Sequence, residues 1–168
     1  VAEETLITWS GTNGESKPAS WNDLTQISHT FAAPMLGGAG DGSNVVIAHG
    51  YNNNYMVSNN NGSSFTNQTF TSLKINDLKY VNGKFIAAGN DGWVGTSSDG
   101  NNWTETRAYA SNSYDYKEIA GTGNTYVAFG NNGKTASTTD GGSTWARGDI
   151  GGNATDFSYA GVTSNGQI

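Results

Sequence analysis

The chain lacks cysteine, has only two prolines and carries few charged residues. Without cysteine it has no disulfides, no thiolate metal ligands and no cysteine nucleophile. Charged residues make up 13% of the chain, the net charge is −6, and the Lys and Arg residues form no cluster, which argues against nucleic acid and anionic membrane surfaces as partners. No apolar run approaches the roughly 20 residues of a membrane-spanning helix. We therefore expect no nucleic-acid partner and no membrane insertion.

Glycine, asparagine and strand-forming residues are abundant instead. Glycine accounts for 24 of the 168 residues, and Val, Ile, Phe, Tyr and Trp supply much of the apolar content. Glycine and asparagine provide the positive φ angles of tight turns, while β-branched and aromatic side chains favour strands. No helical stripe of apolar residues extends beyond a turn or two. The composition predicts an all-β fold, and the length suits a single domain covering 1–168.

Three stretches of the chain repeat one pattern. They are Val45–Phe65, Lys84–Trp103 and Thr125–Trp145. Each reads as an apolar strand ending in glycine, a turn of Asn, Asp and Gly, a second strand, a polar turn and an aromatic residue. Gly50, Gly89 and Gly130 recur at intervals of 39 and 41 residues. A period near 40 residues built from short strands predicts the four-stranded antiparallel blades of a β-propeller.

The repeat also gives blade boundaries. Asn82-Gly83 and Gly123-Asn124 sit between alternating segments and predict hairpins that join strands A and B of two blades. The expected units are 1–27 with strands C and D, then 28–72, 73–110 and 111–152, and finally 153–168 with strands A and B. The ring has four blades if the two ends share one blade. Otherwise the chain is part of a larger propeller, an option that the abrupt stop at Ile168 favours.

The turn between strands C and D carries a recurring motif of hydroxyl, Asp or Asn, Gly and aromatic residue. Its residues are Ser58, Asn60, Gly62 and Phe65; Ser97, Asp99, Gly100 and Trp103; and Thr138, Asp140, Gly142 and Trp145. The motif resembles the Asp-box (BNR) repeat of sialidase-like propellers. We expect the Asp or Asn to accept from turn amides, glycine to take a left-handed φ, and the aromatic ring to pack between blades. One carboxylate per turn is too few ligands for calcium, so the role is structural.

Residues for catalysis are scarce. The resemblance implies an arginine triad in an active sialidase, but this chain has only Arg107 and Arg147, four and two residues beyond the strand-D aromatic. We interpret both as repeated blade positions. Asp77, Asp115 and Asp156 recur at the expected starts of strand A, either as a repeated polar contact or as an acidic ring around a channel.

Other potentially reactive residues have bland interpretations. His29 and His49 have no Asp or Ser constellation near them in the sequence, and we expect His49 to be a packed strand residue. The segment Gly37–Gly42 lacks the Lys-Ser/Thr ending of a phosphate loop and is interpreted as a turn between strands A and B. The sequence thus predicts no catalytic residues, no cofactor and no metal site.

Propeller topology places the B–C and D–A loops on one face, away from the Asp boxes. The candidate ligand face there comprises Tyr51, Asn53, Tyr55, Asn90, Asp91, Trp93, Asn131, Tyr114 and Tyr116. Amides and carboxylates beside aromatic rings suit sugar hydroxyls and the apolar faces of sugars. Glycan contact is therefore one prediction for this face.

The style of the repeat is similar to Asp-box propellers of phage tails, other virion proteins and bacterial surface proteins. That resemblance implies a non-catalytic structural or adhesive module of a virion (tail, fibre, baseplate or capsid decoration) or of an extracellular surface assembly. Its partners would be protein neighbours or a cell-surface glycan, with self-association left open. Two alternatives are a fragment of a sialidase-like glycoside hydrolase and an assembly-factor propeller of the photosystem type, although an arginine-rich face is missing.

Overall fold

The computed structural model describes residues 3–9, 24–30, 35–42, 45–50, 52–110 and 114–150. The described residues form strands, turns and two short 3-10 segments, η2 (Asn90–Gly92) and η3 (Asn131–Gly133). The strands are β1 (Glu3–Trp9), β2 (Leu24–Thr30), β3 (Met35–Gly40), β4 (Val46–Gly50), β5 (Asn54–Ser58), β6 (Thr66–Thr69), β7 (Ile75–Val81), β8 (Lys84–Gly89), β9 (Trp93–Ser97), β10 (Thr104–Arg107), β11 (Tyr116–Thr122), β12 (Thr125–Gly130), β13 (Lys134–Thr138) and β14 (Ala146–Asp149).

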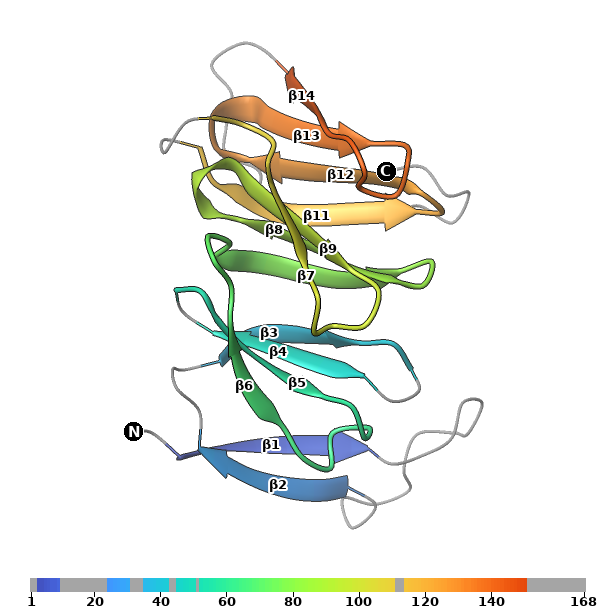
Figure 1. Ribbon diagram of the computed structural model, residues 1–168. Helices are drawn as coiled ribbons and strands as arrows, with labels where there is room; N and C mark the ends of the chain where they lie inside the picture. Colours follow the sequence, from blue (N-terminus) through green and yellow to red (C-terminus); the bar gives the residue numbers. More distant parts are fainter. Residues whose placement is uncertain are drawn as a thin grey trace.

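These strands form three four-stranded antiparallel sheets and one two-stranded sheet. Strands β3 to β6, β7 to β10 and β11 to β14 each pair in sequence order, and we call these sheets blades 1, 2 and 3. Strands β1 and β2 pair antiparallel as a separate hairpin. The sheets lie one above another, and β7 packs between β3 and β11, the first strands of the neighbouring blades (Figure 1). The all-β, blade-repeat architecture predicted from the sequence is confirmed.

The hairpins that join the first two strands of blades 2 and 3 use positive φ angles. Asn82 has φ 47° and Gly83 has φ 80°, as a two-residue type I′ turn requires. Gly123 has φ 55° at the corresponding turn of blade 3. These turns let β7 pair with β8 and β11 pair with β12 without a longer loop.

The core lies between the sheets. One apolar cluster joins blades 1 and 2 and consists of Ile47, Tyr55, Val57, Phe70, Leu73, Ile75, Leu78, Phe85 and Ala87. A second joins blades 2 and 3 and consists of Ile86, Ala88, Val94, Tyr116, Ile119, Tyr126, Ala128 and Ala136. Blade 2 contributes to both clusters because strand side chains alternate between the two faces of a sheet, so Phe85 and Ile86 belong to different clusters.

Two boundaries differ from the sequence-based prediction. Strand β2 continues to Thr30, beyond the expected unit end at residue 27. The glycines expected in a turn instead form most of β3, and only Asp41 and Gly42 lie beyond the strand. Gly37 is needed there because a Cβ atom would lie 3.0 Å from Nε2 of His49 on the paired strand. The unit expected at 153–168, and with it Asp156 and the closure of the ring, lies outside the described residues.

Candidate functional site

The Asp box of blade 3 is a closed hydrogen-bonded turn. Thr138 Oγ1 donates to Asp140 Oδ1 at 2.6 Å and accepts from the backbone N–H of Gly142 at 3.1 Å. The other end of the turn is fixed by Thr144, whose backbone N–H and hydroxyl both donate to the Asp140 carboxylate. Gly141 and Gly142 have φ 72° and 87°, which side-chain-bearing residues rarely adopt. The carboxylate therefore satisfies amides at the tip of the hairpin.

Blades 1 and 2 reach the same arrangement with different residues. In blade 1 the side chain of Asn60 replaces the carboxylate, and its Oδ1 accepts from Ser58 Oγ and from the backbone N–H of Ser64. In blade 2, Asp99 accepts from the backbone N–H groups of Asn101 and Asn102 at 2.9 and 2.7 Å. Since a neutral amide serves in blade 1, the negative charge is not required for the turn to form.

The box carboxylates make the stability of the protein sensitive to acid. Hydrogen bonds from Asn102 lower the pKa of Asp99 to about 2, from an ordinary value of 3.8. Those from Thr138 and Thr144 hold the pKa of Asp140 below its usual range. A lowered pKa gives stability that is present above about pH 4 and is lost as the pH falls through the folded value.

We therefore expect the unfolding temperature to fall between pH 4 and pH 2. The double variant Asp99→Asn/Asp140→Asn should keep both turns, as Asn60 does, and should lose most of this dependence. Thermal unfolding followed by circular dichroism at several pH values measures the effect. Parallel curves for the variant and the unsubstituted chain would contradict the assignment.

The aromatic residue after each box packs into the core. Trp103 makes edge contacts with Phe70 and Tyr55, at centroid distances of 5.1 and 6.3 Å, and lies against Gly95 of its own blade. Its Nε1–H donates to the carbonyl of Gly100 at 3.0 Å, so the indole joins the box to the contact with blade 1. Phe65 is buried, and Trp145 packs against the cluster between blades 2 and 3.

The expected ring of aspartates is wrong. Strand register pairs Ile75 with Gly89 and Tyr116 with Gly130, and a β-bulge follows in each blade. Asp77 therefore corresponds to Glu118, while Asp115 precedes β11. The sequence spacing misled because it does not show where a bulge adds a residue.

The arginines do not occupy equivalent blade positions either. Arg147 pairs with Ala136 and corresponds to Glu105, which pairs with Gly95. Arg107 lies at the end of β10 opposite Trp93, and its Nε–H donates to the carbonyl of Asp91 at 3.2 Å. Each arginine is thus held by its own local contacts.

His49 is a packed strand residue, 3% exposed, on β4. Its Nδ1 is buried and has no hydrogen-bond partner in the described part of the chain. Burial lowers its pKa to about 4, against an opposing effect from Asp77. The imidazole is therefore neutral at pH 7 and fills the space that Gly37 leaves open. The side chain of His29 lies outside the described part of the structure.

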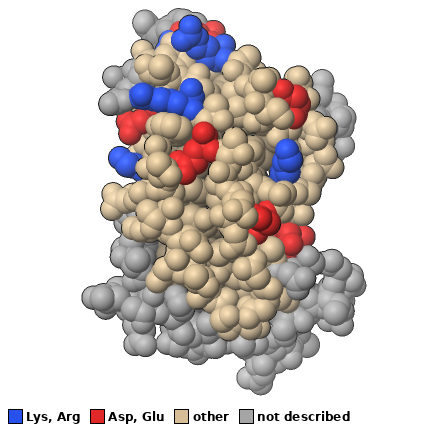
Figure 2. Space-filling model, in the orientation of Figure 1, with Lys and Arg blue, Asp and Glu red and all other residues tan. Residues whose placement is uncertain are grey.

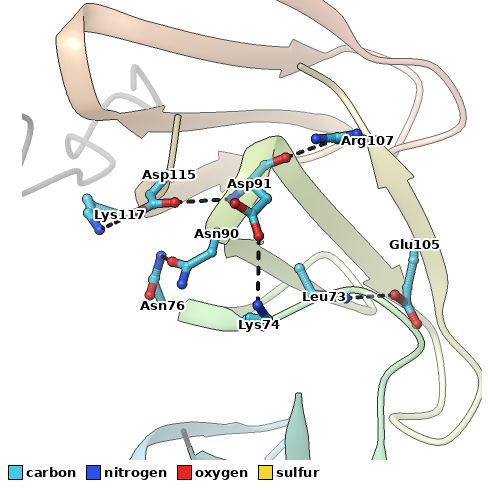
Figure 3. Close-up of polar contacts among 9 residues, drawn as sticks. All are labelled: Leu73, Lys74, Asn76, Asn90, Asp91, Glu105, Arg107, Asp115 and Lys117. Atoms are coloured by element: carbon cyan, nitrogen blue, oxygen red, sulfur yellow. Dashed lines mark hydrogen bonds and ion pairs between the residues drawn. The ribbon is translucent and has the colours of Figure 1, made fainter. Parts of the chain in front are cut away.

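The B–C turn of blade 2, η2, is fixed from several sides (Figure 3). The backbone N–H of Asp91 donates to Asp115 Oδ1 at 3.1 Å, and its carboxylate lies 3.8 Å from Lys74 Nζ. Asp115 in turn pairs with Lys117 at 3.0 Å. Asp91 has φ 56°, so the turn projects a charged side chain from a left-handed residue. The contacts come from both neighbouring D–A connections and hold the loop in one position.

Asparagines link this turn to the next blade. Asn76 Nδ2 donates both to Asn90 Oδ1 at 2.6 Å and to the backbone carbonyl of Tyr116 at 2.8 Å. In blade 3 the residue in the bulge that corresponds to Asn76 is Lys117, which pairs with Asp115 instead. Asn131 Oδ1 is consequently buried without a hydrogen-bond partner among the described residues.

The structure divides the predicted ligand face. Tyr55 and Tyr116 are core residues, 5% and 0% exposed, and burial raises the pKa of both phenols. They do not line a surface, because each points into an inter-blade cluster. The others on or near the loops are Asn53, Asn90, Asp91, Trp93, Asn131 and Tyr114. Tyr51 lies outside the described residues.

Tyr114 belongs to a patch that sequence reasoning missed. Its ring packs edge-to-face on Tyr109 at 4.8 Å, and Lys134 Nζ lies 5.3 Å from its centroid. The guanidinium of Arg147 lies 5.7 Å from the Tyr109 ring. Lys134 also pairs with Asp149. Ile150, 60% exposed, follows at the end of β14.

We call Tyr109, Tyr114, Lys134, Arg147, Asp149 and Ile150 the blade 2–3 loop patch. Figure 2 shows Lys and Arg side chains gathered toward the blade 3 end of the stack, with Asp and Glu between them. The patch joins residues 109 to 150 from two blades, so no short motif signals it. The tyrosines and cations in the D–A segments were the available sequence signal.

A polar hollow of about 150 Å³ lies on the other side of the molecule. It is lined by Lys84, Thr96, Ser97, Ser98, Asn102 and Thr104, beside the box of blade 2. A liquid water occupies about 30 Å³, so the space is of the order of a few waters. In the described ranges no group of three or more His, Asp and Glu is placed to hold a metal ion. In the same ranges no helix is long and apolar enough to cross a membrane.

Comparison with known proteins supports the fold. No family model matches the chain, and no curated protein matches it. A solved structure described as YCF48 bound to D1 peptide superposes with a TM-score of 0.57 at 18% identity, over 73% of this chain and 43% of that one. YCF48 from Cyanidioschyzon merolae gives a TM-score of 0.53 at 15% identity, over 69% and 40%.

The fold matches the YCF48 propeller. At these identities the likeness shows the fold alone, and the chain spans less than half the length of either YCF48 structure. The three described blades therefore correspond to part of a YCF48-type propeller. The virion and tail-fibre assignments, and the location that goes with them, stay sequence-based predictions.

Proposed function

We propose that the chain is a non-catalytic propeller module of the assembly-factor type, which binds a polypeptide segment through the blade 2–3 loop patch. The observation that carries this proposal is an exposed cluster of Tyr, Arg and Ile on two rigidly joined loops. Tyrosine and arginine are enriched at protein interfaces and supply most of the binding energy there. The structure of YCF48 with a D1 peptide supports a polypeptide ligand for this fold.

Rigidity is the second support. The backbone N–H of Ile150 donates to the carbonyl of Gly133 at 3.0 Å, and that of Tyr109 to the carbonyl of Gly92 at 3.2 Å. Both ends of the patch are thus tied to B–C turns. A preorganised surface loses less conformational entropy when it binds, so even a modest contact area can be specific.

A hydrolytic function has less support. The chain's two arginines are held apart by different partners, the Asp91 carbonyl and the Tyr109 ring. A carboxylate clamp of three arginines therefore cannot come from this chain. Contact with a glycan remains an untested prediction for the same face.

Peptide selection tests the proposal. A displayed library of random peptides would be panned on the purified chain, and selected peptides measured by fluorescence polarisation. Arg147→Ala and Tyr109→Ala should each weaken binding by about 10-fold or more, as expected for hot-spot residues. Lys84→Ala removes the same charge at the opposite end of blade 2 and should leave binding unchanged. A library that yields no binder, or binders indifferent to both patch variants, would refute the proposal. Binding to a glycan array instead would support the adhesive alternative.

A further inference from the structure

Two carboxyl groups meet between the inner strands of blades 2 and 3. Asp77 lies on β7 and Glu118 lies on β11, each directly after the bulge of its strand. The two strands pack against each other, so equivalent positions of consecutive blades face the same side. In blade 1 the corresponding residue is Gly37, and the side chain of His49 occupies the space beside it. The acidic contact therefore exists between blades 2 and 3 and has no counterpart between blades 1 and 2.

Asp77 is well supplied with donors. Its Oδ1 accepts from the backbone N–H of Leu78 at 2.9 Å and from Lys79 Nζ at 2.6 Å. Its Oδ2 accepts from the backbone N–H of Ile119 at 3.0 Å, across the boundary between the blades. The side chain is only 14% exposed. These donors favour the ionised form of Asp77.

Glu118 has the opposite environment. Burial, the charge of Asp77 and a hydrogen bond with Asp77 raise the pKa of Glu118 from its ordinary value of 4.5, and the charge of Lys79 opposes them. With a proton, Glu118 donates O–H to the Asp77 carboxylate, which is a strong charge-assisted bond. Without the proton, two carboxylates face each other and repel.

We propose that Asp77 and Glu118 form a proton-dependent latch that tightens the contact between blades 2 and 3 when Glu118 is protonated. The latch is a property of the inner strands and does not depend on the proposed function of the loop patch. The two features share the same pair of blades, so the latch also controls how firmly the two halves of the patch are joined.

The charged groups on the surrounding strands are few. Strand β7 contributes Lys79, β11 contributes Lys117, which pairs with Asp115, and β4 contributes the neutral His49. Strands β3 and β12 carry no titratable acid or base. Strand β8 carries Lys84, which donates to the carbonyl of Gly141 at the other end of the blade. Lys79 is thus the main cation that offsets repulsion within the pair.

The sign of the pH dependence follows from the raised pKa of Glu118. Its stabilisation is fully present below the unfolded value near 4.5 and is lost as the pH rises through the folded value. His49 acts in the opposite direction, because its pKa of about 4 gives stability that is lost as the pH falls from 6.5 through 4. The curve of the unsubstituted chain is the sum, so the latch is measured as a difference between variants.

Glu118→Gln provides that difference, because an amide N–H can donate to Asp77 at every pH. The unfolding temperature of Glu118→Gln should equal that of the unsubstituted chain near pH 4 and exceed it by about 2–4 °C at pH 8. Asp149→Asn removes the same charge on the same blade and should give a constant offset. A ¹³C NMR titration of the assigned Glu118 carboxyl in the unsubstituted chain, which needs no variant to fold, should have a midpoint above pH 4.5. Parallel stability curves, or a midpoint at or below that value, would overturn the latch.

Discussion

Trp103→Ala is expected to destabilise the protein by about 3 kcal/mol, which corresponds to a fall of roughly 6–12 °C in the unfolding temperature of a chain this long. The indole contacts Tyr55 and Phe70 of blade 1 and covers Gly95 of blade 2. Removing it opens a cavity at the one place where the box of blade 2 meets the cluster between blades 1 and 2. The half-buried position of the ring keeps the expected loss at the lower end for a buried tryptophan.

Trp103→Phe separates packing from hydrogen bonding. Phenylalanine keeps most of the ring contacts but loses the bond from Nε1 to the carbonyl of Gly100. It should cost about 1 kcal/mol, the typical net value of one such bond. Urea unfolding followed by tryptophan fluorescence and circular dichroism measures both variants. If Trp103→Ala costs no more than Trp103→Phe, the ring is not an inter-blade anchor.

The repeat predicted the architecture because its signals are local. Asn82-Gly83 sets a hairpin, and the hydroxyl, Asp and Gly of each box set a turn, so the order of strands within a blade follows from short segments. The aromatic of each box also follows locally, since it opens the last strand next to the neighbouring sheet. These features need no knowledge of distant contacts.

The candidate site was harder to predict because it depends on register and on burial. Tyr55 and Tyr116 stand beside polar loop residues in the sequence, yet strand alternation turns both into the core. The bulges before Asp77 and Glu118 shift the correspondence between blades by an amount that spacing alone does not reveal. Tyr109 and Arg147 meet only because blades 2 and 3 stack. Such contacts between blades carry the function proposed here.

The connection between blades 1 and 2 depends on one carboxylate. Glu105 accepts from the consecutive backbone N–H groups of Thr71, Ser72 and Leu73 at 2.8, 2.7 and 2.8 Å (Figure 3 shows the bond to Leu73). Leu73 is fully buried, so the connection enters the core where it is clamped. Three bonds to one charged acceptor replace the strand pairing that this segment lacks.

Glu105→Ala is expected to cost about 3 kcal/mol, because it leaves three backbone donors without their acceptor and each bond to a charged group is worth about 1.5–3 kcal/mol before allowance for exposure. Glu105→Gln should cost about half as much, since its single carbonyl oxygen can still accept while its NH₂ group meets other donors. Urea unfolding measures the global loss, and hydrogen exchange at Thr71, Ser72 and Leu73 measures the local one. Faster exchange confined to these amides, with global stability unchanged, would mean that the clamp orders the connection without joining the blades. Unchanged exchange in both variants would show that the three bonds do not form in solution.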